Sequence, residues 1–103
     1  MLQRVKLAMR ISTDVYDAEL LGLIAAGIAD LENVGATFEH DMTTGTGGAV
    51  TNYTINDPLP ATAVVTYCRM MFGSPSDFDR LKEAYEMQKG QLRENHRYGM
   101  EAL

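Results

Sequence analysis

The segment 15–34 constrains the fold most, because two opposite faces of the α-helix that it predicts both lack charged side chains. One broad face of this helix carries large aliphatic side chains, namely Leu20, Leu23, Ile24, Ile28 and Leu31. The opposite face carries only small residues without charge, namely Gly22, Ala25, Ala26 and Ala29. A helix on a protein surface has charged side chains on its outer face, so this pattern predicts burial on both sides.

Boundary signals flank this helix and a second apolar one. Asp14 and Asp17 stand three residues apart, which is the spacing of a pair that caps a helix N-terminus. Gly35 is the expected left-handed cap at the other end. Another helix is expected over 58–72, with Asp57 as its cap and a proline in its first turn. The apolar side chains of this helix leave only a thin polar strip along its surface, so the helix is also predicted to be buried on most sides.

Two further helices have apolar residues along one side only. The first covers 2–9, and the other begins in the segment SPSDFD (74–79) and continues to about Asn95. Residues 36–56, by contrast, lack a helical period and are rich in glycine, threonine and asparagine. The composition on both sides of the glycines is typical of strands, so this long central loop can contain a short β-hairpin.

These elements predict an all-α fold, a small bundle of about four helices with the long central loop between helices two and three. A chain of 103 residues is expected to form one domain over 1–103. Residues 36–56 are expected to be a flexible loop and 96–103 a mobile tail. No apolar run approaches the ~18 residues of a membrane span, so we expect no membrane association.

The charges are distributed unevenly along the chain, whose net charge is −5. Arg4, Lys6 and Arg10 make the first ten residues basic, and the next lysine or arginine is Arg69. The intervening segment carries only acidic charges, which makes it a poor surface for a polyanion. A helix-turn-helix reader of DNA is therefore disfavoured, although a short helix, a tight turn and a longer helix open the chain.

The stretch MTTGTGGAV (42–50) has the glycines and hydroxyls of a phosphate-binding loop but not its chemistry. A Walker-type loop ends in Gly-Lys-Ser/Thr, whereas Gly48 is followed by Ala49 and Val50. A dinucleotide fingerprint needs a helix directly after the glycines, and the residues here are strand-like. Carboxylates flank the segment and no cation lies within it. We therefore predict no nucleotide site.

Other candidate chemical sites are equally weak. Cys68 lies inside a predicted buried helix, where a thiol has a raised pKa and is inert, so we interpret it as a structural cysteine. The sequence Glu39-His40-Asp41 offers three types of metal ligand, but in an extended strand the histidine points away from its neighbours. No second ligand cluster accompanies it. We therefore expect no enzymatic activity, no cofactor and no metal.

Two helices that require burial on both sides exceed what a chain of this size can cover. One interpretation is that the small face of the helix at 15–34 is filler, since alanine is simply a good helix former. The alternative is a close contact with another subunit, which small residues permit. We favour the second interpretation and expect self-association through Gly22, Ala25, Ala26 and Ala29.

Three segments carry a resemblance to a known family: LAMRISTDVYDAELLGLIAAGIADLENVG, DPLPATAVVTYCRMMFG and DFDRLKEAYEMQKGQLRENHRYG. Three features match the family's pattern. They are the acidic pair before the long helix, the Asp57-Pro58 step that opens the third helix, and Tyr85 followed by Leu92 in the last helix. The sequence resembles the small head–tail connector (adaptor) proteins of tailed bacteriophages, sometimes labelled DNA-packaging proteins. The resemblance covers most of the chain apart from residues 36–56.

The resemblance implies an all-helical structural protein that forms an oligomeric ring on the portal vertex. The ring extends the DNA channel and receives the next neck or tail component, so the implied partners are other copies, the portal protein and that component. The genome would pass through without specific binding, since an acidic wall repels phosphate. The implied location is the head–tail junction of the virion, with assembly in the host cytoplasm.

Two further residue sets follow from this hypothesis. A channel or interface loop is expected at Glu39, Asp41, Gly45, Gly47 and Gly48. Docking to the portal or neck is expected, on charge and expected mobility, at Arg4, Lys6, Arg10, Arg97 and Tyr98. The alternative hypothesis is a small helical regulatory or binding module, dimeric and associated with DNA. Such a module would stop at a dimer, whereas a connector forms large closed oligomers.

Overall fold

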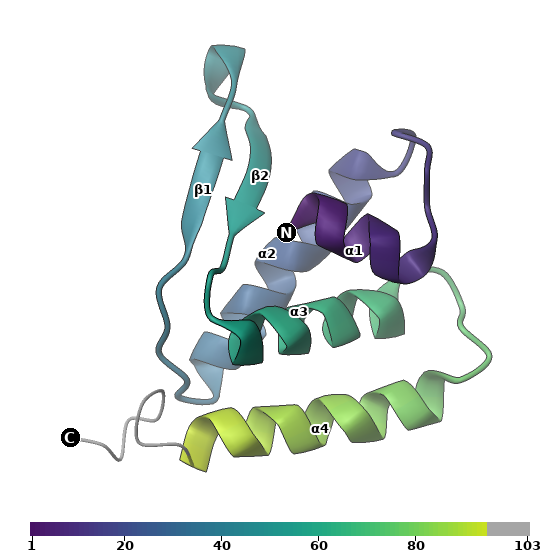
Figure 1. Cartoon of the computed structure of the whole chain (residues 1–103), viewed down its shortest axis with the longest axis vertical. Helices are drawn as coiled ribbons and strands as arrows, with labels where there is room; N and C mark the ends of the chain where they lie inside the picture. The colour runs from purple at the N-terminus through teal and green to yellow at the C-terminus, as the bar shows by residue number, and fades with distance from the viewer. Residues whose placement is uncertain (95–103) are drawn as a thin grey trace.

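The computed structural model describes residues 1–94, which form four α-helices and one β-hairpin (Figure 1). The elements in chain order are α1 (Leu2–Met9), α2 (Asp17–Asn33), β1 (Asp41–Thr44), the short 3-10 turn η1 (Thr46–Gly48), β2 (Val50–Thr54), α3 (Pro58–Met71) and α4 (Phe78–Glu94). The mainly helical fold with a hairpin between helices two and three confirms the predicted fold class. The expected tail at 96–103 lies outside the described residues.

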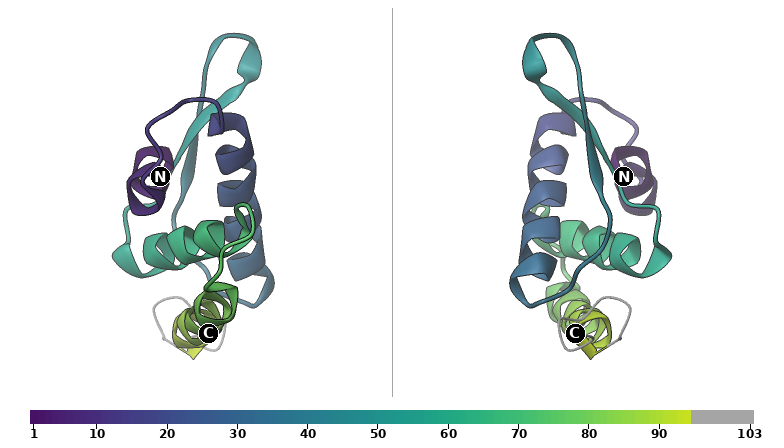
Figure 2. Two further views of the ribbon diagram at one scale, coloured as in Figure 1. Left: turned by 90° about the vertical axis from the view of Figure 1, so that its right-hand side faces the viewer. Right: turned by 90° about the vertical axis from the view of Figure 1, so that its left-hand side faces the viewer.

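α3 is the central helix, since it packs against α1, α2 and α4. Figure 2 shows α1 and α2 on opposite sides of the molecule, with α4 at the end away from the hairpin tip. Because three helices surround α3, its apolar circumference is explained within the chain. Asp57 caps it as predicted, accepting a hydrogen bond from the backbone N–H of Leu59 at 3.3 Å.

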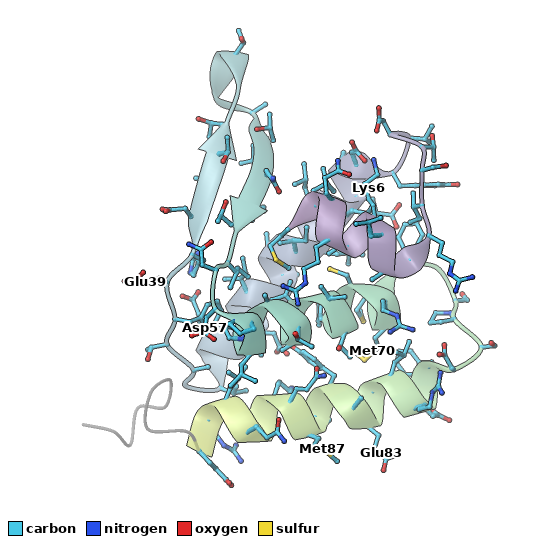
Figure 3. The ribbon with its side chains drawn as sticks, viewed as in Figure 1. Lys6, Glu39, Asp57, Met70, Glu83 and Met87 are labelled. Carbon is cyan, nitrogen blue, oxygen red and sulfur yellow. The ribbon has the colours of Figure 1, made fainter. Side chains whose placement is uncertain are left out.

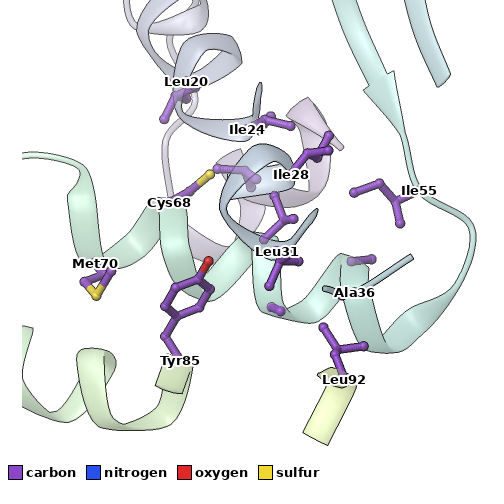
Figure 4. Packing of buried hydrophobic residues seen from close by; sticks show 14 of the residues in the cluster. Leu20, Ile24, Ile28, Leu31, Ala36, Ile55, Cys68, Met70, Tyr85 and Leu92 are labelled. Atoms are coloured by element: carbon purple, nitrogen blue, oxygen red, sulfur yellow. The ribbon is translucent and has the colours of Figure 1, made fainter. Parts of the chain in front are cut away.

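The core lies around α3, where the large face of α2 and the buried sides of α1 and α4 meet (Figure 4). Leu20, Ile24 and Leu31 have no exposed surface, and Ile28 is 4% exposed. The predicted core face of α2 is therefore confirmed, with Leu23 partly buried against the core. The helix ends as expected too, because Gly35 has a φ of +98° and Ala36 N–H bonds back to the carbonyl of Leu31 at 3.1 Å.

The predicted capping pair at the start of α2 is wrong. The helix begins after Tyr16, and no side chain caps it. Asp14 and Asp17 instead each hold the ammonium of the buried Lys6 at 2.9 Å. An amine removed from water requires nearby carboxylates more strongly than a helix terminus does, because water can satisfy an exposed terminus.

The central segment forms the hairpin that its composition allows. Its strands pair antiparallel, with Asp41 opposite Thr54 and Met42 opposite Tyr53. A two-stranded hairpin is marginal by itself, but this one is anchored to α1. The side-chain oxygen of Asn52 accepts a hydrogen bond at 3.0 Å from the N–H of Leu2, at the unsatisfied first turn of α1.

Candidate functional site

The small face of α2 is open in the single chain. Gly22, Ala26 and Ala29 are exposed and Ala25 is partly buried, although the other side of the same helix has almost no exposed surface. A side-chain carbon added at Gly22 would meet no atom within 4 Å. The prediction that α2 is buried on both sides therefore does not hold within one chain. The result is a flat, uncharged helix surface that a second backbone can approach closely.

A polar cluster at the edge of this face fixes α4 onto α2. The hydroxyl of Tyr85 donates a hydrogen bond of 2.6 Å to a carboxylate oxygen of Asp30, and the Lys89 ammonium lies 3.4 Å from the same oxygen. That ammonium also lies 4.9 Å from the centre of the Tyr85 ring. Burial, and then the hydrogen bond with Asp30, raise the pKa of Tyr85, so its hydroxyl remains a donor.

The acidic segment at the start of β1 is exposed at all three of its residues, Glu39, His40 and Asp41. His40 turns to Glu32, with 3.0 Å between its Nε2 and the carboxylate oxygen. The three side chains therefore do not converge on one point. Within residues 1–94, no group of three or more histidine, cysteine or acidic side chains is arranged to hold a metal ion.

The glycines of the central segment form the hairpin tip. Gly47 and Gly48 have φ angles of +79° and +83°, so the turn requires residues without a side chain. The N–H of Gly45 closes the turn on the carbonyl of Ala49 at 2.8 Å. All three glycines are exposed, and the strand β2 rather than a helix follows them. This geometry lacks the helix N-terminus on which a phosphate loop depends.

Four of the five expected docking residues fall into three groups. Arg4 is exposed at α1 and hydrogen-bonds the hydroxyl of Thr62 at 3.2 Å. Lys6 is buried, and its ion pairs with two aspartates raise its pKa, so its ammonium is committed inside the chain. We therefore do not retain Lys6 as a docking residue. Arg97 and Tyr98 lie outside the described residues.

Arg10 occupies a more specific position than its charge predicted. It follows α1 with a φ of +59°, and it lines a cleft of about 250 Å³ together with Arg69. Sequence reasoning missed this cleft because the two arginines are far apart in the chain. No signal in the sequence indicated their proximity, because it depends on how α1 and α3 pack.

Cys68 is buried in α3 against the large face of α2 (Figure 4). Burial raises the pKa of its thiol to about 12, so almost no thiolate is present near neutral pH. This agrees with its interpretation as a structural cysteine. In the part of the chain that the structure describes, no helix is long and apolar enough to cross a bilayer.

The family model for "Phage connector protein" matches residues 1–99 of the chain. No curated protein and no solved structure matches the chain. The match extends across every helix and the hairpin, and therefore includes the central residues that carried no resemblance in the sequence.

Proposed function

The chain belongs to the phage connector protein family, and on that premise we propose that it forms a closed ring on the portal vertex. Membership of this family assigns it a structural, non-enzymatic role at the head–tail junction of the virion, in contact with head or tail components. In the proposal, the ring extends the DNA channel from the portal protein and receives the next neck or tail component.

The observation that carries the ring is the difference between the two faces of α2. Gly22, Ala26 and Ala29 leave an uncharged surface exposed along a helix whose other face forms the core. A second copy packed there would cover it, and small residues let backbones approach closely. Because a ring repeats one contact between unlike surfaces, a single such face on each copy is sufficient.

The hairpin tip is proposed as the element nearest the channel. Gly45, Gly47 and Gly48 are exposed at the end of a projecting hairpin (Figure 1). No lysine or arginine lies between Arg10 and Arg69, so the hairpin would offer phosphate no cation to bind and would let DNA slide. Arg4 stays a proposed docking residue, as do Arg97 and Tyr98.

Assembly of the purified protein tests this proposal. Native mass spectrometry and single-particle imaging of the chain, alone and with purified portal protein, should reveal large closed oligomers. A species that stops at a dimer and binds duplex DNA tightly, with a steep dependence on salt, would contradict the ring and favour the regulatory alternative. A chain that stays monomeric in both conditions would overturn the ring outright.

A further inference from the structure

A basic cleft lies where the C-terminal ends of α1 and α3 meet the start of α4. Its volume is about 250 Å³, and Met9, Phe72 and Leu81 contribute apolar surface to its lining.

Arg10 and Arg69 bring two guanidinium groups to the same cleft. Neither arginine has an ion pair within residues 1–94. The one acidic residue of the lining, Asp77, is paired with Arg80 at 2.8 Å, and the charge of Arg69 also helps to lower its pKa. With two arginines and a single carboxylate in its lining, the cleft still has a net positive charge.

The backbone at Arg10 indicates that its side chain serves a purpose. Arg10 N–H bonds the carbonyl of Leu7, and Ile11 N–H bonds that of Lys6, which together form the left-handed cap usually made by glycine. The same cap at the end of α2 does use a glycine, Gly35. An arginine is less favourable in this conformation, and such residues concentrate at functional positions.

A complementary pair of carboxylates lies at the opposite edge of the molecule. Glu39 projects from one side of the molecule in Figure 3, while the ends of α1 and α3 lie at the other side. Asp41 follows two residues later, so in an extended segment both carboxylates face the same way, about 7 Å apart. His40 faces the other way, toward Glu32. Within the described residues, neither Glu39 nor Asp41 has an ion pair of its own.

We propose that the basic cleft of one copy receives the Glu39–Asp41 segment of a second copy. Two carboxylates on one edge match two guanidinium groups on the other, and arginine is well suited to binding carboxylates. A contact between unlike surfaces on opposite edges continues from copy to copy, and it closes if the rotation allows. The inference rests on the proposed ring, and it assigns Arg10 to the contact between copies instead of to the portal.

Charge reversal tests the contact from both sides. The cleft variant carries Arg10→Glu and Arg69→Glu, and the segment variant carries Glu39→Lys and Asp41→Lys. Each should assemble at least roughly tenfold more weakly than the wild type, because like charges would face each other across the contact. Combining all four substitutions in one chain should restore assembly. An equimolar mixture of the two variants should yield oligomers that contain both chains.

Controls separate the contact from general effects of charge. Lys82→Glu with Arg93→Glu changes the net charge as much as the cleft variant does, at exposed positions of α4 outside the cleft, and should leave assembly unchanged. Circular dichroism and thermal melting verify the fold of each variant. The neutral pairs Arg10→Gln with Arg69→Gln, and Glu39→Gln with Asp41→Asn, should weaken assembly less than the reversals do.

The outcomes distinguish this inference from the ring itself. A wild-type chain that stays monomeric, alone and with portal protein, overturns both. A wild-type chain that assembles while both reversed variants assemble equally well overturns only the inference. Loss of assembly in both variants without rescue in the combined chain also overturns it, because the two surfaces would then meet different partners. If the cleft variant assembles like the wild type and loses only binding to DNA, the inference is overturned and the cleft is identified as a phosphate site.

Discussion

The two faces of α2 differ in what covers them. Leu20, Ile24 and Leu31 are completely buried on the side of α2 that packs against α3, α1 and β2, whereas Gly22 and Ala29, on the same helix, are exposed. Both faces lack charge, so hydropathy does not distinguish them. Side-chain size does, because large side chains fill the space between helices and small ones leave a flat surface. The comparison separates residues that stabilise one chain from residues available to join chains.

Truncation on the large face should have the greatest effect. Ile24→Ala leaves a cavity between α2 and α3 and should lower the free energy of unfolding by about 2–5 kcal/mol. The melting temperature should fall by more than ~10 °C. Thermal and urea unfolding measure the change, with Ala29→Ser on the exposed face as the control, expected within ~0.5 kcal/mol. Equal losses in the two variants would contradict the distinction between the faces.

The hydrogen bond at the edge of α2 should contribute less. Tyr85→Phe removes the hydroxyl that donates to Asp30 and should lower the free energy of unfolding by about 1–2 kcal/mol, since Asp30 remains partly exposed to water. Tyr67→Phe is a matched control, because its ring lies 5.4 Å from that of Tyr85 and its hydroxyl makes no hydrogen bond within residues 1–94. If both variants unfold alike in urea, the bond between α2 and α4 contributes nothing measurable.

Arg10→Gly should change stability in the opposite direction. Glycine adopts the left-handed cap of α1 without steric cost, so the protomer should gain about 0.5–1 kcal/mol. Assembly should nevertheless weaken, because the cleft loses one guanidinium group.

Gly35→Ala at the equivalent cap of α2 should instead destabilise the protomer by ~1 kcal/mol. Thermal melting and native mass spectrometry, applied to the same samples, would reveal whether stability and assembly change in opposite directions. A destabilised Arg10→Gly would contradict the interpretation of this cap.

A charge on the small face should have the smallest effect on the protomer and the largest on the ring. Ala29→Glu and Ala25→Glu should keep the helix content and lie within about 0.5 kcal/mol of the wild type, since the opposite face supplies the core. Assembly should fail, because an unpaired charge at a covered interface costs several kcal/mol, repeated at every contact.

Circular dichroism and native mass spectrometry test this separation. Met87→Glu, at an exposed apolar position of α4, is the control for a charge placed elsewhere on a helix surface. If Ala25→Glu and Ala29→Glu still form rings, the small face is not the interface. If both unfold, that face belongs to the protomer core and the comparison of the two faces fails.

Interactions between residues close in sequence determined most of the fold, and they can be recognised in the sequence alone. The cap at Asp57 and the left-handed cap at Gly35 involve neighbouring residues, so short motifs located the start of α3 and the end of α2 correctly. The helical period likewise identified the large face of α2 as core, because that pattern depends only on spacing. The composition around the glycines indicated that a hairpin can form.

Tertiary structure decided where charges and hydroxyl groups are used. Asp14 and Asp17 have the spacing of a helix cap, yet they pair with Lys6 because the packing of α1 buries that amine. Tyr85 meets Asp30 across 55 residues of sequence. The cleft of Arg10 and Arg69 exists only where the ends of α1 and α3 meet. Contacts between distant segments depend on how helices pack, and helical periodicity contains no information about which charged residues that packing brings together.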